Sequence, residues 1–291
     1  MTLWKNPHPT QMKSNLSDSI RMIEAWKNPE IQDPHVPDAI VEGQGMWKAR
    51  LLKFDTLSST NTWAMQHMDF VRHGDVVWAL HQTKGKGRLE RSWVAPANRG
   101  LTFSVVLFYS AGTSANPVLG QTAAVAIHQT LEKHRIQSQL KWPNDVMVKD
   151  RKIAGTLTES HRGRNAVVLG IGVNVNLTQK DINAACFDRP STSMHIETGE
   201  SFSIHRLLED LICALEKMIE AFNSNRISRI FDLWQPCDYL AGNFIEIQKV
   251  DGKERGKYAG LDGLGRLRMI DDQGREKVFW SGDVKKIIPM E

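Results

Sequence analysis

Four segments with the pattern of β-strands constrain the fold of this chain more than any other feature. They lie at 76–81, 101–109, 152–160 and 166–176. Several alternate apolar with polar positions, which is the two-residue period of a strand. Two helices accompany them: one would be capped by Ser59 or Thr60, and one would begin at Asn116-Pro117 and run to about residue 135. Because the order is not a regular β-α-β alternation, we expect an α+β domain whose mixed β-sheet carries helices on one face.

Changes of composition divide the chain into three parts. Residues 1–45 are polar and rich in proline, and we expect an extension with one short helix capped by Ser17. Residues 46–238 hold the predicted strands and a long amphipathic helix over 207–222, whose apolar stripe is typical of core packing. In residues 239–291, short alternating segments separated by turns predict a small SH3-like β-barrel.

The net charge and the cysteines exclude several classes of protein. The charge is +4 over 291 residues, with acidic and basic residues mixed, whereas a nucleic-acid-binding chain usually has a larger, segregated basic excess. We therefore expect no DNA partner. The cysteines at 186, 213 and 237 are too far apart for a disulfide framework or a zinc ribbon, which predicts free thiols and no metal site. With no signal-peptide core and no run of roughly 20 apolar residues, we expect a cytoplasmic protein without a membrane partner.

The stretch QTKGKGRLERSW, residues 82–93, has the most unusual composition in the sequence. It places four cationic residues close together, opposed by a single glutamate, with Gly85 and Gly87 between them. Glycines let a backbone approach a ligand closely, and cationic side chains donate charge-assisted hydrogen bonds to anions. The stretch lacks the Gly-Lys-Ser/Thr end of a Walker A loop. Its composition alone leaves open an anion-binding loop and a solvated surface loop.

Three shorter motifs carry polar residues in otherwise apolar surroundings. KWPND, at 141–145, predicts a hairpin turn that presents Asn144 and Asp145. In KIAG, Lys152 enters a strand whose glycine leaves room for a neighbouring group. In GIGVNVN, Asn174 lies on an apolar strand, and a buried amide needs hydrogen-bond partners. Each motif taken alone fits plain packing as well as a binding site.

The order of these motifs is more specific than any one of them. The chain reads SSTN, QTKGKGRLERSW, KWPND, KIAG and GIGVNVN, and a small β-domain follows. From about residue 52 to 288 it resembles the biotin–protein ligases, also called biotin–[acetyl-CoA-carboxylase] ligases. The resemblance implies a catalytic domain like those of class II aminoacyl-tRNA synthetases and biotin ligases, followed by the SH3-like barrel. Because residues 1–45 match no DNA-binding domain, it implies the monofunctional type.

The resemblance also implies the reaction and its partners. Biotin would react with ATP, whose phosphates carry Mg²⁺, to give biotinyl-5′-AMP and pyrophosphate. The biotinyl group would then pass to one lysine of the biotin carboxyl carrier protein of acetyl-CoA carboxylase or a related carboxylase. Lys152 and Arg88 are the implied catalytic residues, since they would offset the repulsion between a carboxylate and the α-phosphate. The protein would be a monomer or a homodimer.

The same resemblance assigns residues to the two halves of the site. Those implied for biotin are Ser59, Thr60, Asn61, Gln82, Gly85, Lys86, Gly87, Arg88, Asp145 and Lys152, and those implied for the nucleotide are Arg88, Trp93, Asn144, Lys152 and Asn174. Trp93 would pack on the adenine. Asp145 would lie near the ureido end of biotin, and Lys152 would meet both the biotin carboxylate and the α-phosphate.

Two positions depart from the pattern of the family. Lys86 stands where arginine is usual, and Glu90 stands where glycine is usual. Lysine keeps the charge but loses the bidentate fork of a guanidinium. Glutamate adds a negative charge beside a phosphate site and removes backbone freedom. Both changes bear on how firmly the loop retains an intermediate.

Other functions remain open at the level of the sequence. A lipoate-type protein ligase would share the fold and the adenylate chemistry, and competition between biotin and lipoate would separate the two. A non-catalytic biotin sensor or DNA-binding regulator would need a DNA-binding domain, and a gel-shift assay would detect it. A scaffold without a ligand would leave the glycine- and lysine-rich stretch unexplained.

Overall fold

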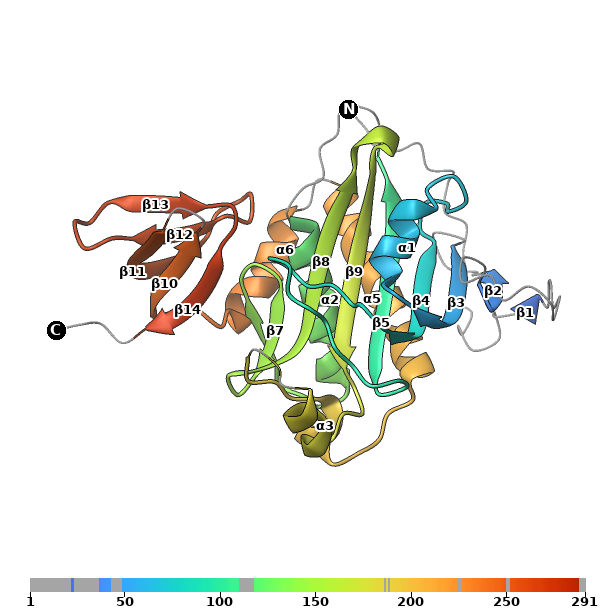
Figure 1. The fold of residues 1–291 in the computed structure, drawn as a ribbon. Helices are drawn as coiled ribbons and strands as arrows, with labels where there is room; N and C mark the ends of the chain where they lie inside the picture. Colours follow the sequence, from blue (N-terminus) through green and yellow to red (C-terminus); the bar gives the residue numbers. More distant parts are fainter. Residues whose placement is uncertain are drawn as a thin grey trace.

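A computed structural model describes residues 22–23, 37–42, 49–109, 118–185, 187, 189–224, 227–249 and 252–287. Within these residues the chain forms a nine-stranded sheet and a separate five-stranded sheet (Figure 1). The strands of the large sheet are β1 (Met22–Ile23), β2 (Ala39–Glu42), β3 (Arg50–Leu57), β4 (Val76–Gln82), β5 (Gly100–Phe108), β6 (Gln139–Lys141), β7 (Asp145–Val148), β8 (Arg151–His161) and β9 (Ala166–Asn174). Their order is β1-β2-β3-β4-β5-β9-β8-β7-β6. Among the described strands β3 and β4 run parallel and the other neighbours antiparallel, so the sheet is mixed.

The neighbouring strands β5 and β9 lie in the middle of the large sheet. All residues of β9, and all of β5 except its last, are buried, as expected for strands covered on both faces. The strands predicted at 76–81, 101–109, 152–160 and 166–176 are confirmed as β4, β5, β8 and β9, with ends shifted by one or two residues. The mixed α+β architecture is therefore as predicted.

Helices cover both faces of the large sheet, so the expectation of helices on one face was wrong. The helices are α1 (Thr60–Gln66), α2 (Val118–Lys133), α3 (Gln179–Ala184), α4 (Met194–Thr198), α5 (Ile204–Asn223) and α6 (Ile227–Trp234). Figure 1 shows α1 in front of the sheet, and α2, α5 and α6 behind it. Trp63 and Ala64 of α1 belong to a small core cluster separate from the main core behind the sheet. A pattern of apolar residues shows that a helix packs, but not against which face.

The predicted helices agree with the structure in the body of the chain and disagree near its start. Ser59 caps α1, and the amphipathic stripe at 207–222 lies in α5. Asn116-Pro117, the expected start of another helix, lies outside the described residues, and α2 is described from Val118. The short helix expected after Ser17 is wrong at Met22 and Ile23, which pair with β2 as strand β1. Pairing with a strand distant in sequence overrides a local helical period there.

A main-chain carbonyl of the second sheet accepts two hydrogen bonds from the body of the large sheet. The strands of the second sheet are β10 (Phe244–Lys249), β11 (Gly252–Leu261), β12 (Leu267–Ile270), β13 (Glu276–Phe279) and β14 (Asp283–Ile287), in the order β13-β12-β11-β10-β14. The carbonyl oxygen of Gly265 accepts hydrogen bonds from Nε2 of Gln121 at 2.7 Å and from Nε1 of Trp142 at 2.9 Å. The start of β14 lies beside the same tryptophan, since a Cβ on Gly282 would lie 3.9 Å from the Trp142 ring. The SH3-like barrel stays a prediction.

Two further findings concern the cysteines and the membrane. Cys213 and Cys237 are free thiols, and Cys186 lies outside the described residues. Within the described part of the chain, every helix is too short or too polar to span a bilayer.

Candidate active site

A cavity above strands β8 and β9 contains almost all of the residues predicted for the site. Thirteen were predicted, and all of them except Gly85 line it. Gly85 lines an adjoining hollow under the loop at 83–92, which we call the glycine loop. The sequence motifs thus come together in one place.

The floor of the cavity is made of glycines that leave space for the functional side chains. In the register of β8 with β9, Gly155 pairs with Gly172, and Leu157 pairs with Gly170. A Cβ on Gly172 would lie 2.3 Å from the Trp93 indole, and a Cβ on Gly155 would lie 2.9 Å from Nζ of Lys152. Such distances are below any van der Waals contact. Trp93 and Lys152 therefore lie directly on the paired backbones of the two strands.

A cluster of uncharged polar side chains lies two residues further along the same strands, at the pair of Leu157 and Gly170. A Cβ on Gly170 would meet Oδ1 of Asn61 at 2.3 Å, so this amide also lies on the floor. Oδ1 accepts a hydrogen bond of 2.6 Å from the Ser104 hydroxyl. The main-chain N–H of Thr60 donates to Oε1 of Gln82 at 2.7 Å. The first turn of α1 and the end of β4 therefore present hydrogen-bonding groups without charge.

The glycine loop is closed into a tight hairpin by its own backbone. Lys86 and Ser92 form an antiparallel bridge, and the N–H of Gly87 donates to the carbonyl of Arg91 at 2.7 Å. The N–H of Trp93 donates to the carbonyl of Gly85 at 2.9 Å. A Cβ on Gly85 would lie 2.3 Å from the Trp93 carbonyl oxygen, so the hairpin needs glycine at this position.

The tip of the glycine loop is strained at Glu90, one of the two positions that depart from the pattern noted in the sequence. Leu89 has φ 54° and Glu90 has φ 59°, which is the left-handed region that favours glycine. A residue with a Cβ costs about 1–2 kcal/mol there. Glu90 is exposed at the tip, so its charge faces solvent in this conformation.

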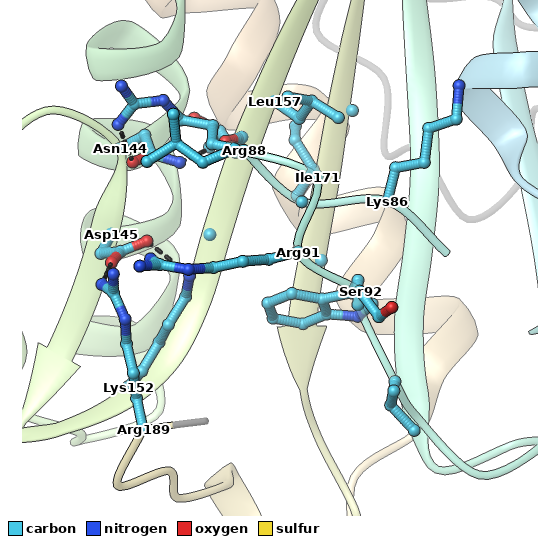
Figure 2. A pocket seen from close by; sticks show the side chains of 18 of the residues that line it. Lys86, Arg88, Arg91, Ser92, Asn144, Asp145, Lys152, Leu157, Ile171 and Arg189 are labelled. Carbon is cyan, nitrogen blue, oxygen red and sulfur yellow. Dashed lines mark hydrogen bonds and ion pairs between the residues drawn. The ribbon is translucent and has the colours of Figure 1, made fainter. Parts of the chain in front are cut away.

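A chain of ion pairs joins the body of the large sheet, the glycine loop and the C-terminal sheet. Nζ of Lys152 lies 2.5 Å from Oδ1 of Asp145, whose Oδ2 lies 3.2 Å from Arg189. Asp283, the first residue of β14, lies 2.6 Å from Arg189 and 2.6 Å from Arg91 of the loop. Figure 2 shows Lys152 and Arg189 both pointing at Asp145. The role predicted for Asp145 at the ureido end of biotin stays a prediction.

The cavity has an excess of positive charge. Six cationic residues line it against two carboxylates among the described residues: Lys86, Arg88, Arg91, Lys141, Lys152 and Arg189, against Asp145 and Asp283. Burial lowers the pKa of the Arg88 guanidinium, against the pull of both carboxylates, but an arginine stays charged at neutral pH. Burial likewise lowers the pKa of Lys141. Such a site favours an anionic ligand, because anionic oxygens would compensate the cations.

Arg88 is held in place by the KWPND turn. Its Nη1 donates to Oδ1 of Asn144 at 3.1 Å, and Nδ2 of Asn144 donates to the carbonyl of Thr156 at 2.5 Å. Figure 2 shows Arg88 beside Asn144 at the side of the cavity. The turn thus connects the loop with strand β8.

Two buried polar atoms of cavity residues have no hydrogen-bond partner among the described residues. Nδ2 of Asn174 donates to the carbonyl of Thr192 at 2.9 Å, but its Oδ1 has no hydrogen-bond partner among the described residues. Nε1 of Trp93 likewise has none within the part of the chain that is described. Both residues were predicted on the nucleotide side. Buried groups without partners are costly unless a ligand or water satisfies them.

Prediction from sequence missed several side chains of the cavity. Arg189, Asp283 and Lys141 line it, and Glu159 lies in the adjoining hollow under the loop. Arg91 was part of the basic stretch, which was the only available signal for it. Arg189 and Asp283 lie in stretches without any motif, and only the tertiary fold brings them to the cavity.

The fold and the cavity are those of a class of protein ligases, as similarity to known proteins shows. The sequence model of the Biotin/lipoate A/B protein ligase family matches residues 53–176. The chain shares the fold of the biotin protein ligase from Aquifex aeolicus in complex with biotin and ATP. The TM-score is 0.72 at 24% identity, over 81% of this chain and 99% of that one.

Two curated relatives make the identification more specific. The biotin–[acetyl-CoA-carboxylase] ligase of Mycobacterium tuberculosis is 30% identical over 209 residues, which are 69% of this chain and 72% of the relative. The bifunctional ligase/repressor BirA of Bacillus subtilis is 29% identical over 240 residues, 81% of this chain and 73% of the relative. The chain belongs to the biotin–protein ligase family.

Proposed function

We propose that this chain activates biotin as biotinyl-5′-AMP and transfers it to a lysine of a biotin carboxyl carrier protein. One observation carries the proposal: Lys152 lies between the Asp145 carboxylate and the Trp93 indole, 5.6 Å from the centre of the ring. A cation beside an aromatic ring that lines the cavity suits the junction of a phosphate and a base. The neutral cluster around Asn61 lies one step along the floor, where the vitamin would fit.

The nucleotide half is supported by the groups left without partners. Adenine would stack on Trp93, and its amino group would donate to Oδ1 of Asn174, which has no partner among the described residues. The α-phosphate would then lie at Lys152, with Arg88 and Arg91 above it on the glycine loop. Mg²⁺ would enter with ATP, held by the phosphate oxygens, and neutralise part of the phosphate charge.

The vitamin half is supported by the mixture of apolar and neutral polar groups. Leu157 and Ile171 line the cavity beside the cluster of Thr60, Asn61 and Gln82. A largely apolar bicyclic ring with a ureido group matches a pocket that has few, well-placed polar groups. The biotin carboxylate would extend toward Lys152.

The first step would join two anions. An oxygen of the biotin carboxylate attacks the α-phosphorus, the bond from that phosphorus to the bridging oxygen breaks, and pyrophosphate leaves. Lys152 and Arg88 would lower the barrier by compensating charge that moves toward the leaving group. The closed loop would exclude water from the mixed anhydride.

The second step would be acyl transfer to the carrier. The neutral ε-amine of the carrier lysine attacks the acyl carbon, the bond from that carbon to the phosphate oxygen breaks, and AMP leaves. An amide forms, and the amine proton passes to solvent. The carrier lysine is the nucleophile, so no nucleophilic side chain of this chain is required.

The test uses the purified chain with ATP, Mg²⁺, labelled biotin and a biotin carboxyl carrier domain. We expect label on the carrier only when ATP is present, and none on a carrier whose acceptor lysine is replaced by arginine. Excess lipoate should not compete with biotin. Labelling that lipoate suppresses would favour the lipoate-type reaction, and ATP-independent labelling would contradict the proposal.

A further inference from the structure

Glu159 is a carboxylate beside the cavity to which neither the motifs nor the proposed reaction gives a role. It lies on β8, two residues beyond Leu157, so it shares the strand face that forms the floor. Its Oε2 accepts a hydrogen bond of 2.8 Å from Nδ2 of Asn61. Its Oε1 lies 3.7 Å from Nζ of Lys86. One carboxylate thus contacts both helix α1 and the glycine loop.

We propose that Glu159 is a positioning residue that fixes the glycine loop in its closed position and the Asn61 amide in its orientation at the same time. The inference rests on the proposed function, because it concerns how biotinyl-5′-AMP is retained. Figure 2 shows Lys86 pointing away from the group around Asp145, so Lys86 is directed elsewhere than the other cations.

Because the glycine loop forms a hairpin, a contact that holds one of its residues also holds the rest of the loop. Lys86 bridges to Ser92, and Gly87 bonds to the carbonyl of Arg91, so these residues move as a unit. Arg91 is anchored on the other strand of the hairpin by Asp283. Two carboxylates on different elements, Glu159 and Asp283, therefore hold the two strands of the loop.

The Asn61 amide is oriented from both of its ends. Ser104 donates to Oδ1 and Glu159 accepts from Nδ2, while the missing Cβ of Gly170 lets the amide lie on the floor. Without Glu159 the amide could rotate about its last torsion. Orientation of this amide and closure of the loop thus depend on the same side chain.

The residue type at position 86 sets the strength of the contact between Lys86 and Glu159. A lysine presents one ammonium group rather than a bidentate fork, and the Lys86 side chain is 47% exposed. The contact with Glu159 is therefore an ion pair that water screens in part. Its loss should change the retention of the intermediate by a small but measurable factor.

Two substitutions at Glu159 separate the two contacts. Glu159→Gln keeps an acceptor for Asn61 but removes the charge that faces Lys86, whereas Glu159→Ala removes both. Labelled biotinyl-5′-AMP is bound to each protein, and its release is followed after addition of excess unlabelled compound. We expect Glu159→Gln to speed release by about two- to five-fold, as for a partly exposed ion pair. We expect only Glu159→Ala to raise the KM for biotin as well.

A double-substitution cycle with Lys86→Gln tests the coupling. If the two residues act through each other, the double variant releases the adenylate no faster than the faster single variant. Asp69→Asn is the matched control, because it removes an equal charge from a pair with Arg164 outside the cavity, and its release should equal that of the unaltered protein. Thermal unfolding of each variant confirms the fold.

Three results would overturn the inference. They are release from Glu159→Gln at the unaltered rate, a double variant whose effect is the product of the single effects, and an equal acceleration in Asp69→Asn. An unaltered chain that does not bind biotinyl-5′-AMP would instead overturn the proposed function, and the inference with it. The two failures are therefore distinguishable.

Discussion

The ammonium group of Lys152 lies 2.5 Å from Oδ1 of Asp145, on the bare backbone of Gly155. Asp145 is also bound by Arg189, so its carboxylate keeps a cationic partner when Lys152 is removed. A change at Lys152 should therefore affect the reaction without leaving a buried charge unpaired.

We predict that Lys152→Ala slows biotin-dependent pyrophosphate release by about 100- to 1,000-fold, as expected for loss of one preorganised donor at a developing charge. The thermal midpoint should stay near that of the unaltered protein. Lys149→Ala is the control, because Lys149 is 75% exposed and pairs with Glu197 instead. Near-normal pyrophosphate release in Lys152→Ala would remove this lysine from the chemistry.

Gly172 tests the position of the nucleotide base. A methyl group at this position would overlap the Trp93 indole, and overpacking of this kind costs about 1–3 kcal/mol. We expect Gly172→Ala to weaken ATP binding by about ten-fold, since ten-fold corresponds to about 1.4 kcal/mol. Gly263→Ala, which would meet no atom within 4 Å, should bind ATP normally in the same calorimetric titration. Equal affinities would show that Trp93 does not hold the base.

Asp283 tests whether the C-terminal sheet takes part in the site. Its side chain is 15% exposed and pairs with Arg91 and Arg189. We expect Asp283→Asn to raise the KM for ATP by about ten-fold, because loss of a charged hydrogen bond costs about 1.5–3 kcal/mol and the partly exposed Arg91 lessens the effect. Asp272→Asn, at an exposed turn of the same sheet, is the control. Steady-state kinetics measure the KM for ATP of both variants. If both values equal that of the unaltered protein, the C-terminal sheet takes no part in ATP binding.

His73 gives a prediction for stability against pH. Burial lowers the pKa of His73 below 6.5, against the pull of the Asp75 carboxylate, and the N–H of Phe108 donates to its Nδ1 at 3.0 Å. The unfolded chain therefore binds a proton at a higher pH than the folded chain, so stability falls as pH drops through 6.5 toward the folded pKa. Urea unfolding should give a smaller free energy of unfolding at about pH 5 than at about pH 7.

The comparison variant for this pH effect is His73→Asn, whose amide oxygen can accept from Phe108 without titrating. Its free energy of unfolding should fall less steeply with pH. The slope should not vanish, because burial also lowers the pKa of His128. Identical slopes in the two proteins would contradict a role for His73.

The sequence predicted those parts of the fold and the site that are local in the chain. Strands buried on both faces, such as β5 and β9, are mostly apolar, and the Ser59 cap marks the start of α1. The side of the sheet on which α1 packs depends on contacts distant in sequence and could not be predicted. Nor could the pairing of Arg91 with Asp283, which are 192 positions apart.

The residues that the motifs missed share one property. Arg189 lies between α3 and α4 and Asp283 begins β14, and contacts between residues distant in sequence bring both to the cavity. Neither lies in a stretch whose composition is unusual. Glu159 lies on a predicted strand, but nothing local distinguishes it from a solvent-facing glutamate. Only the tertiary structure shows that these three residues lie in or beside the cavity.

The most direct test of the central claim is to isolate the intermediate. The chain is incubated with biotin, ATP and Mg²⁺, passed rapidly through a desalting column, quenched with acid and analysed by mass spectrometry. We predict biotinyl-5′-AMP in an amount equal to the protein, and its complete transfer to a carrier domain added before the quench. Recovery of unchanged biotin alone, from protein that is folded, would contradict the account.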